Sequence, residues 1–507
     1  MIYKKLIFSF LFLVFAQLSY SQYFDDLKRY VDENYSGSAR YNSMGGAFGS
    51  LGGEFSSISD NPASGAVFNY TQIGFSLKLN DEKNSVSYNN SNTSKESNDF
   101  DFNQFGIVFV LNNDSSSWSK LNFSFNYQLQ NIYNDKFSVK GSSNIGIDNY
   151  FLNYAQGVDL SNLKLNDNET ISGLYQFLGS SPNLGFGAQQ AFLGYQGYIV
   201  NPLSNTNDNN SYLTNAKYSN NLNQELYLNS SGDNKKSSFN ISGFYKNNLY
   251  VGLNINSYEI NYSETRDFYE NNYDFESNLR SLQFRNNLKT FGKGASIQIG
   301  IIALLKNNFR LGMSYHSPIW YKFFEESSQY LISSHKIDEI FYEDTVDPNT
   351  INVYPEYKLK IPSKLSGSIS YVFNKKGIVS FEFTTQNISS ANFSNNINNS
   401  FTDLNNEINS SSKTKTTIKT GVEYKLYDSV SLRGGFLNQS SYVKSYNNGL
   451  NAISFGVGFN FGYSFLDISF QKFNLKDSKK IFNSALNNNF SIKKESTRIV
   501  ATYTINL

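Results

Sequence analysis

Four cationic side chains occur at positions where each could bind an anionic group next to an apolar surface. Lys78, Arg310, Arg433 and Arg498 each adjoin an apolar residue within a segment that alternates between apolar and polar side chains. Neighbouring side chains of an extended strand point to opposite faces, so we expect the four cations on the polar face. A cation there could bind the carboxylate of an amphipathic ligand.

The same phase places acidic residues on the polar face. Glu382, Glu423 and Asp467 fall there by the same alternation. Carboxylates and cations that share an enclosed interior commonly pair with one another and hold its shape. The sequence therefore leaves two interpretations open for each charged residue: a ligand contact, or a structural ion pair.

These charged residues must be positioned by strands. Residues 121–130 and 453–462 alternate strictly, with aromatic and aliphatic side chains on one face and amide, hydroxyl or glycine residues on the other. Stretches of about ten alternating residues are typical of transmembrane β-barrels. We predict about fourteen strands, near residues 71–80, 102–111, 121–133, 238–246, 249–260, 294–305, 309–316, 358–373, 378–387, 414–426, 429–437, 450–461, 464–473 and 496–507.

The connections between these segments alternate in length. Residues 247–248, 306–308, 374–377, 427–428 and 462–463 form short links, whereas 81–101, 134–237, 261–293, 317–357, 388–413, 438–449 and 474–495 form long ones. Short turns at one end and long loops at the other are the asymmetry of an outer-membrane barrel. A secreted adhesin or propeller is the alternative all-β fold, but no period of 20–50 residues repeats.

The composition favours the barrel and excludes other classes. The 507 residues include 44 Phe and 37 Tyr, no Cys, and a net charge of +1. Many aromatics and a low net charge argue against disorder, and the absence of a basic excess argues against nucleic-acid binding. Without Cys there is no disulfide framework, thiolate metal site or thiol nucleophile.

The N-terminus indicates export. Lys4 and Lys5 precede an apolar run from Leu6 to Leu18, and Ser19 and Ser21 are small residues before a cut ahead of residue 22. This pattern is a signal peptide, and the run is too short to span a membrane. We expect residues 1–21 to be removed.

A glycine-rich segment before the first strand does not alternate. It contains Gly45, Gly46 and Phe48, followed by the Asn61-Pro62-Ala63 sequence. A nucleotide-binding loop would need a strand before it and a helix after it, and neither is present. Asn61 can cap a turn, and Pro62 restricts Asn61 to extended conformations.

These residues resemble a known family. Met44 to Phe48, Leu51-Gly52 and above all Asn61-Pro62-Ala63 are similar to the N-terminal pattern of the FadL/TodX-type outer-membrane hydrocarbon and long-chain fatty-acid transport proteins. Residues 359–371, 421–436 and 456–470 are similar to strands of that family. The resemblance implies a fourteen-stranded barrel plugged by a small N-terminal hatch, with Tyr23 and Phe24 bordering the ligand. It also makes Arg433 the best candidate for a ligand anchor.

We therefore expect residues 22–70 to form the hatch and 71–507 an all-β transmembrane barrel, with 134–237 as a long extracellular loop insertion. The expected function is passive uptake of hydrophobic molecules such as long-chain fatty acids across the outer membrane. The alternative is a barrel that docks protein partners in secretion or surface assembly. We expect a monomer in contact with outer-membrane lipid, without cofactor, nucleic acid or enzymatic activity, since His316 and His335 lie in no catalytic motif.

Overall fold

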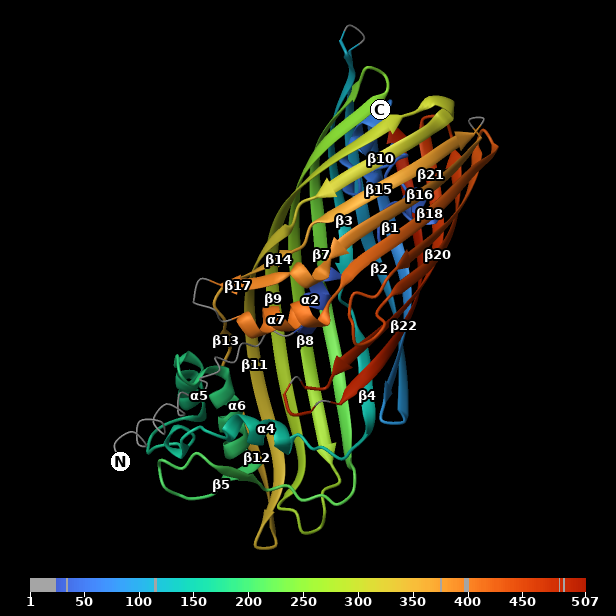
Figure 1. Ribbon diagram of the computed structural model, residues 1–507. Coiled ribbons are helices and arrows are strands. Elements are labelled where there is room, and N and C mark those ends of the chain that lie inside the picture. Colours follow the sequence, from blue (N-terminus) through green and yellow to red (C-terminus); the bar gives the residue numbers. More distant parts are fainter. Residues whose placement is uncertain are drawn as a thin grey trace, which may run out of the picture.

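The computed structural model describes residues 24–32, 35–113, 116–373, 376–395, 401–482, 484–486 and 488–507. The expected signal peptide and Tyr23 lie outside these residues. Most of the described chain forms one antiparallel sheet of 20 strand segments, drawn in Figure 1. In the described part of the chain, no helix is long and apolar enough to cross a membrane.

The sheet closes on itself because the last strand pairs with the first, from Gln72 opposite Asn506 to Ser87 opposite Ser491. Over the described residues this gives a closed antiparallel barrel of 14 strands, which confirms the predicted fold class. In ring order the strands are β1 (Gln72–Tyr88), β2 (Ser91–Asn112), β3 (Trp118–Ile132), β7 (Leu222–Tyr245), β8 (Leu249–Asn271), β9 (Leu279–Leu304), β10 (Phe309–His316), β15 (Lys364–Phe373), β16 (Gly377–Asn387), β18 (Thr414–Tyr427), β19 (Val430–Gln439), β20 (Leu450–Asn460), β21 (Ser464–Lys480) and β22 (Asn489–Asn506).

Further strand segments extend the wall away from the short turns. These are β4 (Lys136–Ser143), β11 (Ile319–Ile337), β12 (Ile340–Val346), β13 (Asn352–Val353), β14 (Tyr357–Ile361) and β17 (Asn392–Asn395), while β5 (Val200–Pro202) and β6 (Tyr212–Thr214) form a separate hairpin. The α-helices are α2 (Phe24–Val31), α3 (Ala39–Ser43), α4 (Asp148–Ala155), α5 (Ile171–Ser180), α6 (Gly185–Gln196) and α7 (Thr402–Ser411). Short 3-10 turns include η1 (Ser56–Ser59) and η2 (Pro62–Val67).

Several strands run far beyond the predicted ranges. β1 and β2 continue to a tight hairpin at Asn89 and Asn90, whose φ angles of 41° and 67° are left-handed. Asparagine tolerates this conformation better than most residues. The sequence predicted a loop at 81–101 because polar residues occupy both faces there, so the period of two disappears although the backbone pairing persists.

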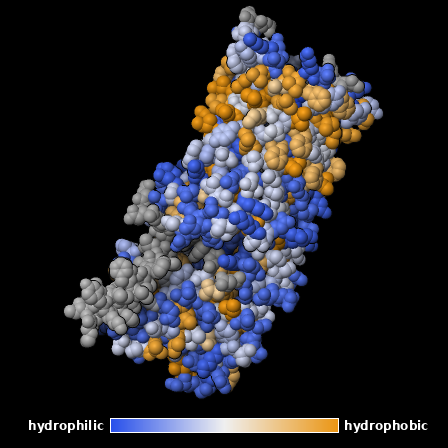
Figure 2. All heavy atoms as spheres, viewed as in Figure 1, coloured by the Kyte–Doolittle hydropathy of each residue, from blue (hydrophilic) through white to orange (hydrophobic). Residues whose placement is uncertain are grey.

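The apolar side of the wall changes along each strand. In β8, Leu253 and Ile255 are exposed and Asn254 is buried, as expected for an apolar outer face and a polar lumen. Further along, Tyr258 and Ile260 are buried, and the outward positions beside them are polar. The apolar outer surface is therefore a belt near the short turns and the C-terminus, visible as the orange band in Figure 2. We call this the short-turn end and the opposite end the distal end.

Candidate lumen site

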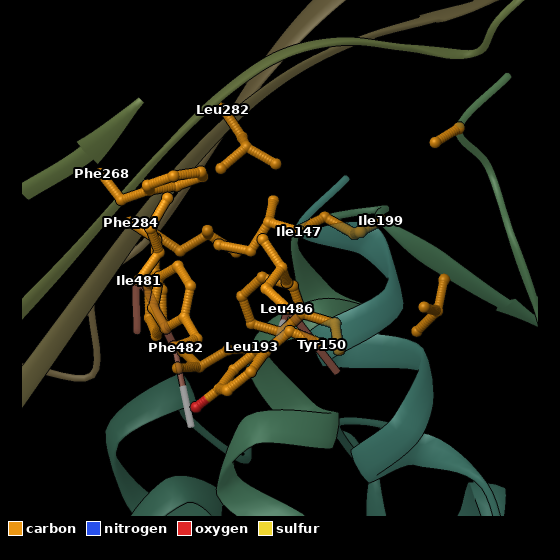
Figure 3. Packing of buried hydrophobic residues seen from close by; sticks show 14 of the residues in the cluster. Ile147, Tyr150, Leu193, Ile199, Phe268, Leu282, Phe284, Ile481, Phe482 and Leu486 are labelled. Atoms are coloured by element: carbon orange, nitrogen blue, oxygen red, sulfur yellow. The ribbon is translucent and has the colours of Figure 1, made fainter. Parts of the chain in front are cut away.

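The interior at the distal end is filled by a large apolar core. It joins α4, α5 and α6 to inward side chains of β1, β4, β7, β8, β9, β11 and β22. Figure 3 shows Tyr150 and Leu193 of the helices facing Phe268, Phe284 and Phe482; the Tyr150 and Phe482 ring centroids are 5.1 Å apart. The expected loop at 134–237 thus contains packed helices, because its aromatic residues find partners inside the barrel.

A buried carboxylate fastens this core to the wall. Glu270 of β8 is 1% exposed and accepts hydrogen bonds from the backbone N–H of Ile147 at 3.0 Å and from Nε2 of Gln224 at 2.6 Å. The Tyr273 hydroxyl donates to the same carboxylate. Burying a polar group costs free energy unless the group is hydrogen-bonded. We call helices α4, α5 and α6 the helical cap, and these donors fix where it begins.

Helix α2 occupies the next layer toward the short-turn end. Its Leu27, Tyr30 and Val31 are buried and lie at helical spacing on one face. The Tyr30 ring stacks on Phe323 with centroids 4.4 Å apart. Phe323 in turn stacks on Tyr321 and Tyr357, both at 5.4 Å. We call these four aromatic residues, Tyr30, Tyr321, Phe323 and Tyr357, the aromatic ladder.

The polar face of α2 is held by charges. Nζ of Lys28 lies 2.7 Å from Asp25 and 3.0 Å from Asp477 of β21. The Arg29 guanidinium lies 3.9 Å from the centroid of the Tyr262 ring and pairs with Asp26 at 3.1 Å. A helix of eight residues is marginal alone, so these contacts determine where α2 sits. Phe24, the first residue of α2, was predicted to border the ligand. It is half-buried and packs against the hydrophobic cluster that contains the aromatic ladder.

A cavity of about 140 Å³ lies beside this polar face. Its lining combines apolar residues such as Tyr133 and Phe137 with the cations Arg266, Lys479 and Lys494. The carboxylates of Asp25, Asp32, Asp135 and Asp477 also line it. Lys494 pairs with Asp135 at 2.6 Å and Arg266 with Glu264 at 2.8 Å. Lys479 forms no ion pair within 4 Å with any other described residue, although its charge acts on the carboxylates of Asp25, Asp135 and Glu264.

Below α2 the lumen is filled by residues 36–68, and we restrict the name hatch to these residues, without α2. Ser38 caps α3 through the N–H of Tyr41, and Asn61 caps η2 through the N–H of Ala63 at 3.1 Å, with Pro62 in its first turn. Asn61 also donates to the carbonyls of Gly49 and of Ile301 in β9. Asn61 thus has the turn-capping role expected from sequence and is also a contact to the wall.

The hatch touches the wall, through backbone and side-chain atoms, where the wall has glycines. These glycines point inward and are Gly74, Gly106, Gly252, Gly300, Gly312, Gly421, Gly435 and Gly456. A β-carbon on Gly435 would collide with Gly45, and one on Gly421 would lie 2.5 Å from the Met44 carbonyl. Gly45 and Gly46 have φ angles of +62° and +75°, which require glycine. Phe48 is fully buried beside Tyr41.

Two buried ion-pair clusters cross from hatch to wall. In the first, Nζ of Lys419 lies 2.8 Å from Asp60 of the hatch and 2.9 Å from Glu382. In the second, Glu423 accepts two hydrogen bonds of 2.9 Å from Arg40 of the hatch and one of 2.6 Å from Arg433. Paired buried charges with this geometry are costly to break from one side.

The four predicted cations point inward, as the strand phase indicated, and each has a protein partner. Arg433 also binds Asp467 at 2.6 Å, and Arg310 donates to the Leu51 carbonyl at 2.8 Å. Lys78 lies 3.6 Å from Asp101, and Arg498 donates to the Tyr35 carbonyl at 2.6 Å. Their ligand-binding role remains a prediction; in this structure they hold the hatch and the wall.

The sequence reasoning missed α2. Its pattern, FDDLKRYV, places Leu27, Tyr30 and Val31 at i, i+3 and i+4 behind two acidic residues, which is an amphipathic helix signal. Lys479 was missed because residues 474–495 were interpreted as a loop, although β21 extends to Lys480.

No protein-family profile matches the sequence, and no curated protein matches it either. Solved structures do. A FadL homologue from Pseudomonas aeruginosa matches with a TM-score of 0.55 and 10% identity over 94% of this chain and 99% of that chain. The toluene transporter TodX of P. putida matches with a TM-score of 0.49 and 11% identity over 94% and 99% of the two chains. The first likeness shows that the two chains share a fold.

Proposed function

We propose that the protein is an outer-membrane channel that admits hydrophobic molecules, and that the aromatic ladder around α2 is where they bind. The main support is that the apolar side chains lie on the outer face of the strands near the short turns and on the inner face toward the distal end. An apolar belt outside suits a bilayer, whereas an apolar lining inside the distal half suits a hydrophobic cargo. The shared fold with the FadL homologue supports the same conclusion.

We further propose that the cargo is amphipathic, with long-chain fatty acids as the best candidates. The cavity beside α2 is lined in part by apolar residues and by Lys479, whose ammonium group would bind the carboxylate of the cargo in place of its electrostatic interaction with neighbouring acidic residues. A hydrocarbon chain would replace Tyr30 and Leu27 of α2 against Tyr321 and Phe323. Binding would thereby loosen α2, which is continuous in sequence with the hatch.

The test is binding of oleate to the purified barrel, with native mass spectrometry of the molecules that co-purify. Lys479→Gln should weaken oleate binding about ten-fold, since a charge-assisted hydrogen bond contributes about 1.5–3 kcal/mol. Binding of an uncharged alkane should not change. Lys476→Gln is the matched control, because Lys476 lies on the same strand and is exposed.

Two results would contradict the proposal. One is a wild-type barrel that binds neither oleate nor alkane. The other is a barrel that carries a stoichiometric protein partner and no hydrophobic molecule, which would favour the docking role. Equal affinity of Lys479→Gln and the wild type for oleate would remove the carboxylate contact but leave a hydrocarbon channel.

A further inference from the structure

The outer wall carries an apolar groove that the lumen site does not involve. Its volume is about 1040 Å³, and its lining comes from β2, β3, β7, β8, β9 and β10 together with the turn before β3. Ile241, Leu253, Ile299, Ile301 and Met313 line it and are each 41–52% exposed. None of the described lining residues is charged.

The groove lies along one row of neighbouring residues that runs across the strands of the sheet. Leu121, Gly243, Val251, Ile301 and Met313 are successive cross-strand partners on β3, β7, β8, β9 and β10. Their side chains share the outer face, but Gly243 contributes none. The row is therefore interrupted at Gly243, and the ring of Trp118 lies over this glycine, 2.9 Å from where a β-carbon would be.

The polar end of the groove lies at the short-turn end. Asn112, Ser116 and Trp118 stand there, at the connection from β2 to β3. Tryptophan with an apolar ring and an N–H donor is typical of the membrane–water interface. The groove is thus apolar along its length and offers uncharged hydrogen-bonding groups at one end, which is the pattern of an amphiphile with its head at the interface.

We propose that this groove retains one acyl chain of a membrane phospholipid, from the leaflet at the short-turn end. The groove is continuous with the apolar belt, whose remaining surface must also be covered by lipid chains. Water would find no partners among its isoleucine, leucine and methionine side chains. That no described lining residue is charged favours an acyl chain over a ligand bound through its charge.

The floor of the groove brings the lipid close to the hatch. Gly252 and Gly300 line the groove, and on their lumen side Pro62 and Asn61 occupy the space where their β-carbons would be. Only strand backbone separates an acyl chain in the groove from these hatch residues. A retained chain would therefore support the wall at the point where the hatch is seated.

The chain's 2 tryptophans allow a direct test. Trp118 lines the groove, whereas Trp320 is 52% exposed on β11 and is not part of it. The mature barrel would be reconstituted in phosphatidylcholine brominated near the head of one chain, which quenches nearby tryptophans. An excess of detergent-dispersed unbrominated phosphatidylcholine would then be added, and the recovery of fluorescence followed in time. Trp320→Phe reports on Trp118 alone, and Trp118→Phe reports on Trp320 alone.

We expect Trp118 to recover its fluorescence about ten-fold more slowly than Trp320, equivalent to about 1.4 kcal/mol of retention. Ile301→Gln, in the Trp320→Phe background, should abolish this difference. Ile453→Gln should not, because Ile453 is a similarly exposed isoleucine (53%) on β20, away from the groove. Thermal unfolding of each variant separates a folding defect from the loss of the groove.

Equal recovery rates of the two tryptophans would overturn the proposal, since they would mean that Trp118 meets only bulk lipid. So would displacement of the brominated lipid by oleate, which would identify the occupant as cargo. The test does not depend on uptake: a barrel that binds no oleate in its lumen can still retain the lipid.

Discussion

The side-chain oxygen of Asn61 lies against the backbone of Gly300, in the space that a β-carbon would occupy. The same glycine lines the outer groove, so hatch and outer surface meet across one residue. We expect Gly300→Ala to displace the hatch, at a cost of about 1–3 kcal/mol for overpacking. Efflux of a small dye from vesicles containing the barrel should rise, and the barrel should unfold at lower temperature.

The matched control is Gly367→Ala on β15. No atom lies within 4 Å of a β-carbon built on Gly367, so the alanine should be tolerated there and efflux should stay at the wild-type level. If Gly300→Ala also leaves efflux unchanged, the contact with Asn61 does not hold the hatch in place.

Arg40 is the cation that ties α3 to β18. Arg40→Ala removes two hydrogen bonds to Glu423, although Arg433 still neutralises that carboxylate. We expect a loss of about 1–3 kcal/mol, because charge-assisted hydrogen bonds are lost but no unpaired buried charge remains. Hydrogen exchange of the α3 amides should accelerate while that of the barrel strands does not.

An exposed pair provides the comparison for Arg40. Lys83 and Glu96 pair at 2.9 Å with side chains 46% and 65% exposed, and such pairs contribute about 0–1 kcal/mol. Lys83→Ala should leave α3 exchange unchanged. Equal exchange in Arg40→Ala and the wild type would show that α3 is held by its glycine contacts alone.

Tyr30 is the residue of α2 that stacks in the aromatic ladder. Tyr30→Ala should destabilise the barrel by about 3–5 kcal/mol, as truncation of a buried aromatic does. It should also open space beside Phe323 and increase alkane binding. Calorimetry of thermal unfolding measures the first effect, and Tyr463→Ala, at an 83% exposed turn residue, should show neither.

The alternation of apolar and polar residues was enough to locate every ring strand near its short turn. Leu121–Gln130 and Ile453–Gly462 lie within or largely within β3 and β20. The pattern works there because lipid on one side and polar groups on the other impose opposite demands on neighbouring residues. Beyond the belt, water replaces lipid, and the outer face of β8 becomes Ser257 and Glu259. The same period of two then has its apolar residues inside.

The candidate site was harder to predict because it depends on contacts distant in sequence. That Arg433 points inward follows from strand phase, but its choice of Glu423 and Asp467 depends on the register of β18, β19 and β21. Lys28 and Asp477 are 449 residues apart. The inward glycines were visible as members of the polar face, but their close contact with the hatch requires the closed barrel.

Asp148 should make the helical cap sensitive to pH. It is 1% exposed, accepts a 2.8 Å hydrogen bond from Thr214, and forms no ion pair with a described residue. Burial raises the pKa of its carboxyl above the ordinary value of 3.8. The folded cap therefore prefers the protonated form. The resulting stabilisation is complete below pH 3.8 and is lost as the pH rises through the higher folded pKa.

Asp148→Asn should remove this part of the pH dependence, because asparagine remains uncharged. We expect the protection of α4 amides, corrected for the intrinsic exchange rate, to fall with rising pH more steeply in the wild type than in the variant. Glu270 titrates in both proteins, and the Asp148 charge contributes to raising the pKa of Glu270, so the difference between the profiles reports the Asp148 charge together with this coupling. Parallel pH profiles would mean that the Thr214 and Tyr218 hydroxyls solvate the charged carboxylate fully, and that burial of Asp148 carries no penalty for its charge.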